Sequence, residues 1–144
     1  MSAFTDPELA YLTEHRRLGR IATVGRDGTP HVVPVGWSYN AQTDTIDVTG
    51  RALDRTKKFR DVARSGRAAI VIDDLATTDP WRPRAIEVRG QAETIAEPQV
   101  AIRIHPERVI SWGLERTPAA HAAADSPCST SSETVCGRSD TVPE

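Results

Sequence analysis

Short strand patterns separated by turn residues fill the first 50 positions, and they constrain the fold more than any other feature. Residues 18–24 (LGRIATV) and 30–39 (PHVVPVGWSY) are rich in apolar and β-branched residues, and the Asp-Gly dipeptide between them is typical of a hairpin turn. Residues 45–49 (TIDVT) alternate as a third strand. This hairpin spacing predicts a mainly β fold, a Greek-key or meander barrel rather than a doubly wound sheet.

Two helices are predicted beside the strands. Thr5 followed by Glu8 is a capping-box pattern, which indicates a short N-terminal helix. Residues 53–65 place apolar side chains three or four positions apart and are followed by Gly66, as in an amphipathic helix that ends at a glycine cap. The second of these is expected to be the central helix of the domain.

The second half of the domain contributes further strands. They are predicted at residues 68–72, 85–96, 101–105 and 109–112. Gly90 is expected to form a bulge, and Pro106 a corner between the last two strands. Residues 73–83 are expected to form a polar loop in which the carboxylates of Asp73 and Asp74 are solvated. The total is six to seven strands.

The composition changes near residue 117, where Ala, Ser, Thr, Pro and acidic residues become dominant. Such a segment cannot offset the entropy of ordering, so residues 1–116 are predicted to be the folded domain and residues 117–144 a disordered tail. Cys128 and Cys136 both lie in this tail, which argues against a disulfide framework.

Charge and composition exclude several function classes. The net charge of −2 gives no reason to expect nucleic-acid or membrane-surface binding. The chain has neither a long apolar run nor a secretory leader, so a cytoplasmic protein is expected. The scattered histidines (His15, His31, His105 and His121) argue against a metal site.

The segment from Thr49 to Lys58 is the best candidate for a functional site. It joins a predicted strand end to a predicted helix start, and a helix start binds phosphate through unpaired N–H groups. Thr56 would add a hydroxyl, Lys58 a cation, and Arg51 or Arg55 further donors. The alternative is a solvated basic helix face balanced by Asp61, and the residues alone favour that alternative.

Tryptophans mark two weaker candidates. Trp37, on a strand interrupted by Pro34, would either wall a planar ligand or pack in the core. Trp81 and Arg84, in the predicted polar loop, would either reach a ligand, across a subunit interface for example, or anchor the loop.

Conventional catalytic motifs are absent. The sequence has no GxGxxG, Walker, GxSxG or HExxH pattern. A chain with so few catalytic groups either binds without reacting or leaves the chemistry to a cofactor.

Four blocks in order carry a family resemblance: RLGRIATVGRDGTPHVVPVGWSYN, TKKFRDVARSGRAAIVIDD, DPWRPRAIEVRGQAE and IHPERVISWG. Together they resemble the pyridoxamine 5'-phosphate oxidase-like superfamily, and within it the actinobacterial F420-dependent branch, over residues 9–114. The resemblance implies an FMN-binding split barrel that forms a homodimer with cofactor sites at the subunit interface. Residues 1–116 would then be a split-barrel cofactor-binding domain.

The resemblance also implies site residues. Thr56-Lys57-Lys58 matches the Ser-x-Lys pair that grips the cofactor phosphate in the oxidase relatives. Thr49, Arg55, Thr56 and Lys58 would hold the phosphate. Val32, Val33, Pro34 and Val35 would lie along the cofactor ring through their backbone, beside Trp37. Trp81 and Arg84 would contribute from the partner subunit.

Departures from the oxidases favour a different cofactor. Their second strand carries an Arg and a Lys, whereas residues 33–38 here carry none, and their C-terminal Arg/His signature is missing. The resemblance therefore implies an oxidoreductase that uses the deazaflavin coenzyme F420 to transfer a hydride to a small electron-poor substrate. An FMN-binding oxidoreductase of the same fold and a non-catalytic flavin- or F420-binding protein are the alternatives.

Overall fold

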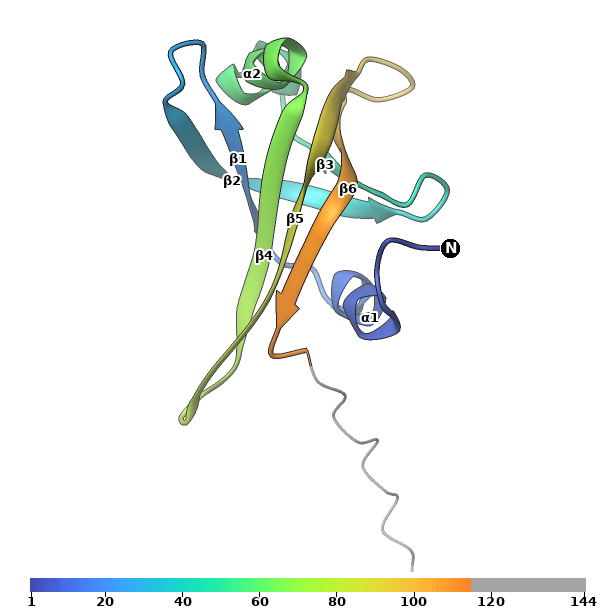
Figure 1. Cartoon of the computed structure of the whole chain (residues 1–144), viewed down its shortest axis with the longest axis vertical. Coiled ribbons are helices and arrows are strands. Elements are labelled where there is room, and N and C mark those ends of the chain that lie inside the picture. The colour runs from blue at the N-terminus through green and yellow to red at the C-terminus, as the bar shows by residue number, and fades with distance from the viewer. Residues whose placement is uncertain (115–144) are drawn as a thin grey trace, which may run out of the picture.

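The computed structural model describes residues 1–114, which form a closed barrel of six antiparallel strands in the order β1-β2-β3-β6-β5-β4 (Figure 1). The strands are β1 (Gly19–Val24), β2 (Pro30–Asn40), β3 (Thr45–Thr49), β4 (Arg67–Thr78), β5 (Trp81–Ile95) and β6 (Ala101–Trp112). The helices are α1 (Asp6–Glu14), the 3-10 turn η1 (Leu53–Arg55) and α2 (Lys57–Ser65). The predicted mainly β barrel is confirmed, while the predicted tail lies outside the described residues.

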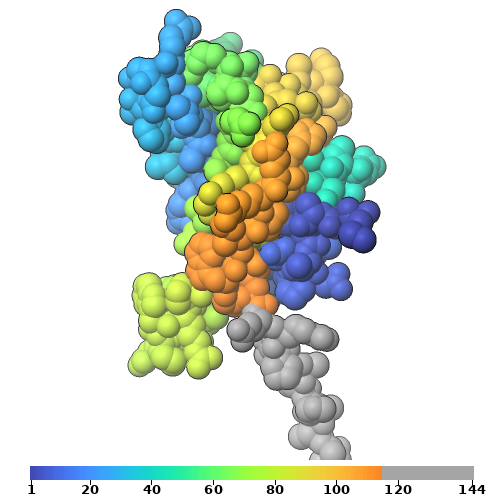
Figure 2. Space-filling view, in the orientation of Figure 1, coloured from blue at the N-terminus to red at the C-terminus, as the bar shows by residue number. Residues whose placement is uncertain are grey.

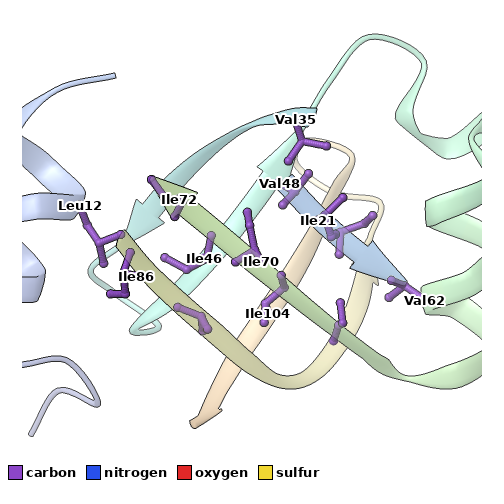
Figure 3. Packing of buried hydrophobic residues seen from close by; sticks show 14 of the residues in the cluster. Leu12, Ile21, Val35, Ile46, Val48, Val62, Ile70, Ile72, Ile86 and Ile104 are labelled. Atoms are coloured by element: carbon purple, nitrogen blue, oxygen red, sulfur yellow. The ribbon is translucent and has the colours of Figure 1, made fainter. Parts of the chain in front are cut away.

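The barrel interior is filled by β-branched side chains that alternate with outward-facing residues along most of the strands, whereas the first four residues of β3 are all buried. Seven isoleucines are fully buried: Ile21, Ile46, Ile70, Ile72, Ile86, Ile102 and Ile104 (Figure 3). Burial of each such side chain stabilises the fold by roughly 1.5–3 kcal/mol. β-branched side chains suit the pleated surface of a sheet, so the same residues favour the strands and fill the core.

A helix covers each end of this core. Leu12 of α1 and Val62 of α2 lie on opposite sides of it (Figure 3). The predicted capping box of α1 is confirmed, because Thr5 N donates to Glu8 Oε2 at 2.8 Å and Glu8 N donates to Thr5 Oγ1 at 3.4 Å. In residues 1–114, no helix has the length and apolar character needed to cross a membrane.

The single helix predicted over residues 53–65 is wrong at its start. Thr56 adopts an extended conformation (φ −88°, ψ 156°) and separates η1 from α2. The apolar spacing from Leu53 continues across this break because both pieces cover the same core. The predicted end is correct, since Gly66 caps α2 in the left-handed conformation (φ 67°).

Two predictions for the second half are also wrong. Residues 73–83 are not a loop, because β4 and β5 continue as a paired hairpin through most of this segment. The two final strands are one strand, β6, whose register shifts opposite Gly90. This register shift confirms the bulge predicted at Gly90. A Cβ at Gly90 would lie only 1.8 Å from the backbone oxygen of His105. This strand-to-strand approach requires glycine.

β2 changes neighbours half-way along its length, and this change opens a free strand edge. Residues 30–35 pair with β1, whereas residues 36–40 pair with β3. Within residues 1–114, the first half of β2 therefore has a ladder partner on one side only. Pro34 lies in that half, where a missing N–H donor is tolerated.

Candidate functional site

The start of α2 presents cations without internal partners. Arg55 is exposed and Lys58 is half-buried, and neither side chain has a hydrogen-bond or ion-pair partner among residues 1–114. Both flank Thr56, the N-cap of α2. A positive charge beside the unpaired N–H groups of a first helical turn suits an anion such as phosphate.

Thr56 itself has an internal role. Its Oγ1 accepts a hydrogen bond from Phe59 N at 3.4 Å and donates one to Leu53 O at 2.6 Å. The Thr56 hydroxyl therefore already donates its hydrogen bond to a backbone carbonyl of η1. Thr56 sets the point at which α2 begins and so positions its free N–H groups, which is a less direct role than the donor role predicted from the sequence.

Asp61 forms a second cluster on α2, and sequence reasoning missed it. Its buried carboxylate accepts from Lys57 Nζ at 2.8 and 3.0 Å, Arg64 Nη2 at 3.1 Å and Thr23 Oγ1 at 3.0 Å. The hydrogen bonds from Lys57 lower the pKa of Asp61 to about 2, so it is a carboxylate at neutral pH. The spacing of Lys57, Asp61 and Arg64 on one helix face is a signal that could have revealed these ion pairs. Asp61 is thus a buried anchor, rather than part of a solvated face.

This cluster borders an open groove between α2 and the β1–β2 turn. These two elements lie together at the upper end of the barrel in Figure 1. The groove measures about 770 Å³ and is lined by Arg26, Asp27, Lys57, Arg60, Asp61, Ala63 and Arg64. Its four cations outnumber its two carboxylates, which favours an anionic ligand. Among residues 1–114, no three His, Cys, Asp or Glu side chains gather in an arrangement suited to a metal ion.

The free edge of β2 offers backbone groups and small apolar side chains. Val32 and Pro34 face outward, whereas Val33 and Val35 face the core. Thr49, the last residue of β3, lies opposite Gly36 on β2 and joins this strand to the segment that leads into α2. The predicted ring-binding strand and phosphate-binding segment are therefore linked through one β-ladder.

Trp37 is partly buried at the edge of the core. It packs against the buried cluster, and its Nε1 donates to Arg17 O at 2.8 Å. These contacts are the ones that core packing predicts, while the role of Trp37 beside a planar ligand stays a prediction.

Trp81 and Arg84 belong to the first residues of β5, in the part of the β4–β5 hairpin that lies at the opposite end of the molecule from α2 (Figure 1). Trp81 is 69% exposed near the tip of the β4–β5 hairpin. The Arg84 guanidinium is engaged by Asp74, through Nε at 2.7 Å and Nη2 at 2.9 Å. Asp74 was expected to be solvated. Burial alone would raise its pKa, but hydrogen bonds from Arg84 and Arg17 hold the pKa of Asp74 well below the usual range.

Comparison with known proteins gives a consistent family. The family model described as pyridoxamine 5'-phosphate oxidase matches residues 5–125. A reductase of 5a,11a-dehydrotetracycline and 5a,11a-dehydrooxytetracycline from Streptomyces rimosus is 41% identical over an alignment of 121 residues that covers 78% of this chain and 84% of that protein.

Solved structures share the fold at low sequence identity. An FAD-binding protein from Mycobacterium smegmatis is 21% identical with a TM-score of 0.58, covering 78% of this chain and 97% of that one. A structure described as an F420 reductase is also 21% identical, with a TM-score of 0.54, covering 70% of this chain and 94% of that one. At this identity, the likeness establishes the fold alone.

Proposed function

The chain belongs to the pyridoxamine 5'-phosphate oxidase family, and on this basis we propose that it is an oxidoreductase that uses coenzyme F420 to reduce a small electron-poor substrate. The relative named as a dehydrotetracycline reductase supports reduction as the reaction. When bound, F420 would supply the hydride, and the protein would supply position and a dry surface.

The observation that carries this proposal is the unpaired charge at the start of α2. Arg55 and Lys58 have no internal partner in residues 1–114, whereas the side chains of Lys57, Arg60 and Arg64 on the same helix each donate a hydrogen bond within the chain. Unpaired cations beside free helical N–H groups fit the phosphate of a flavin-type cofactor. Thr56 would hold the helix start in place, and Thr49 would border the phosphate.

The surface of β2 favours F420 over FMN. The free edge at Val32–Val35 offers backbone groups to the edge of a planar ring, and Val32 and Pro34 offer apolar contact. The strand carries no Arg or Lys to meet the ring and phosphate of FMN as in the oxidases. The same lack of cations argues against oxidation of pyridoxamine phosphate.

Assembly as a homodimer completes the proposed site. The tip of the β4–β5 hairpin lies at the opposite end of the molecule from α2 (Figure 1), and the exposed indole of Trp81, where β5 begins, would be available to a second copy. Size-exclusion chromatography with light scattering would measure the assembly, and a monomer at micromolar concentration would contradict this part of the proposal.

The cofactor is tested by titrating the purified full chain with F420 and with FMN side by side. We expect F420 to bind at least tenfold more tightly, measured by fluorescence. Bound yellow FMN in the purified protein, or tighter binding of FMN, would favour the FMN oxidoreductase instead.

Turnover separates an enzyme from a binding protein. Reduced F420 would be mixed with a panel of enones, quinones and tetrapyrroles, and its oxidation followed by absorbance. Oxidation no faster than in buffer, despite tight binding, would support a non-catalytic F420-binding protein.

A further inference from the structure

The β4–β5 hairpin extends beyond the barrel as a two-stranded projection, which we call the arm (residues 74–84; Figures 1 and 2). β4 pairs with β1 only at residues 69–72, and β5 pairs with β6 only from Ala85 onward. In residues 1–114 the two strands of the arm therefore have only each other as ladder partners. An isolated two-stranded ribbon is marginally stable in water, so its direction needs another support.

Four side chains supply that support at the root of the arm, and we call them the clamp: Tyr11, Arg17, Asp74 and Arg84. Asp74 and Arg84 are directly opposite on β4 and β5 and form a two-pronged ion pair. Arg17 Nε donates to Asp74 Oδ2 at 2.8 Å, and Tyr11 Oη donates to Asp74 Oδ1 at 2.9 Å. Both guanidinium groups stack on the Tyr11 ring, with Cζ atoms 4.1 and 5.2 Å from its centroid.

Two backbone contacts tie the clamp to the barrel. Arg17 O accepts from Trp37 Nε1 on β2, so the residue that grips Asp74 is also fixed to the strand with the free edge. Gly113, after β6, has φ 70° and approaches so closely that a Cβ there would lie 2.4 Å from Pro83 O. The root of the arm is thus held from two sides.

From this arrangement we propose that the clamp positions the arm so that Trp81 reaches the cofactor site of a second copy. Arg84 is then a positioning residue that acts through Asp74, instead of a cofactor ligand. The proposal rests on the proposed function for its statement about the cofactor site. The bracing of the arm by the clamp is independent of any cofactor.

The bracing is tested by hydrogen exchange on Asp74→Asn without cofactor. This change keeps the size of the side chain but removes the charge that holds two guanidinium groups. We expect the arm amides of residues 75–82 to exchange about tenfold faster. The matched control is Asp47→Asn, because Asp47 forms the same two-pronged pair with Arg103 away from the arm, at 3.0 Å for both contacts. It should leave arm exchange unchanged.

The link to the cofactor site is tested by a double-mutant cycle of Asp74→Asn with Trp81→Ala, read by F420 affinity. We expect Asp74→Asn to weaken binding about tenfold in the original chain and less than about twofold when Trp81 is absent. Asp47→Asn should show no such dependence on Trp81. If Asp74→Asn does not fold, Arg84→Lys replaces it in both tests. Lysine keeps the positive charge but cannot form the two-pronged hydrogen bond of the guanidinium group.

The outcomes separate the claims. Unchanged exchange in the arm would overturn the bracing. Equal loss of affinity with and without Trp81 would overturn the link to the cofactor site, as would unchanged affinity in Trp81→Ala. If the original chain binds no F420, the proposed function fails and the hydrogen-exchange result alone decides whether the clamp braces the arm.

Discussion

Asp61 and Asp74 each lie between two basic side chains, at opposite ends of the barrel, but the cations around them differ. Lys57 and Arg64, beside Asp61, are 49% and 36% exposed and border a groove with surplus positive charge. Arg17 and Arg84, beside Asp74, are 5% and 24% exposed and stack on Tyr11. Because its cations are exposed, the α2 end is suited to binding a ligand. Because its cations are more deeply buried, the end with the clamp is suited to supporting the arm.

The difference shows why an ion pair alone does not identify a functional site. A buried cation that loses its partner is costly, whereas a half-exposed cation is less costly to leave unpaired and stays open to a ligand. The α2 end also carries Arg55 and Lys58, which have no partner within residues 1–114, while the clamp satisfies all of its charges internally. We therefore assign binding to the first end and positioning to the second.

The largest expected effect contrasts the two ends directly. Arg17→Ala should lower the free energy of unfolding by about 2–4 kcal/mol, because it removes a buried cation and its stacking on Tyr11. Lys57→Ala should lower it by less, about 1–2 kcal/mol, because Thr23 and Arg64 still donate hydrogen bonds to the buried Asp61 carboxylate. Denaturant unfolding measures both. Equal losses for the two variants would remove the distinction between the ends.

A smaller effect is expected at the α2 cap. Thr56→Ala should lower the free energy of unfolding by about 1 kcal/mol, because the first turn of α2 loses its side-chain acceptor. Thr56→Ser keeps the hydroxyl and should retain most of the stability. If Thr56→Ala unfolds at the same denaturant concentration as the original chain, the capping role is wrong.

A further effect appears only in acid. The pKa of Asp61 is about 2 in the folded protein, against about 3.9 for an unfolded aspartate. Its contribution to stability is therefore fully present above about pH 4 and is lost as the pH falls toward 2. Asp61→Asn should flatten the pH dependence of stability in this window. If the free energy of unfolding of Asp61→Asn falls in acid as it does in the original chain, the ionisation of Asp61 does not contribute to the pH dependence of stability.

The sequence was sufficient for most of the barrel because its strands have one buried face. Residues 19–24 and 86–92 alternate between the core and the surface, and the Gly90 bulge follows from a steric requirement. The arm was missed because both of its faces meet solvent, which leaves no alternation to detect. The break at Thr56 was missed because the apolar spacing continues across it.

The site was predictable only where its residues are neighbours in the sequence. Arg55, Thr56 and Lys58 lie in one segment at a helix start. The clamp joins Tyr11 to Asp74, 63 positions apart, so no local pattern reveals it. Trp37 shows the same limit, since only the fold distinguishes a ligand wall from a core side chain.

The central claim is most directly tested by the affinity of Lys58→Ala for F420. The account predicts binding weaker by about 1–3 kcal/mol, or roughly fivefold to 150-fold, because a charge-assisted phosphate contact is lost. The control Arg108→Ala removes an exposed cation of β6 and should leave the affinity unchanged. Unchanged binding in Lys58→Ala, measured by fluorescence titration of the full chain, would contradict the account.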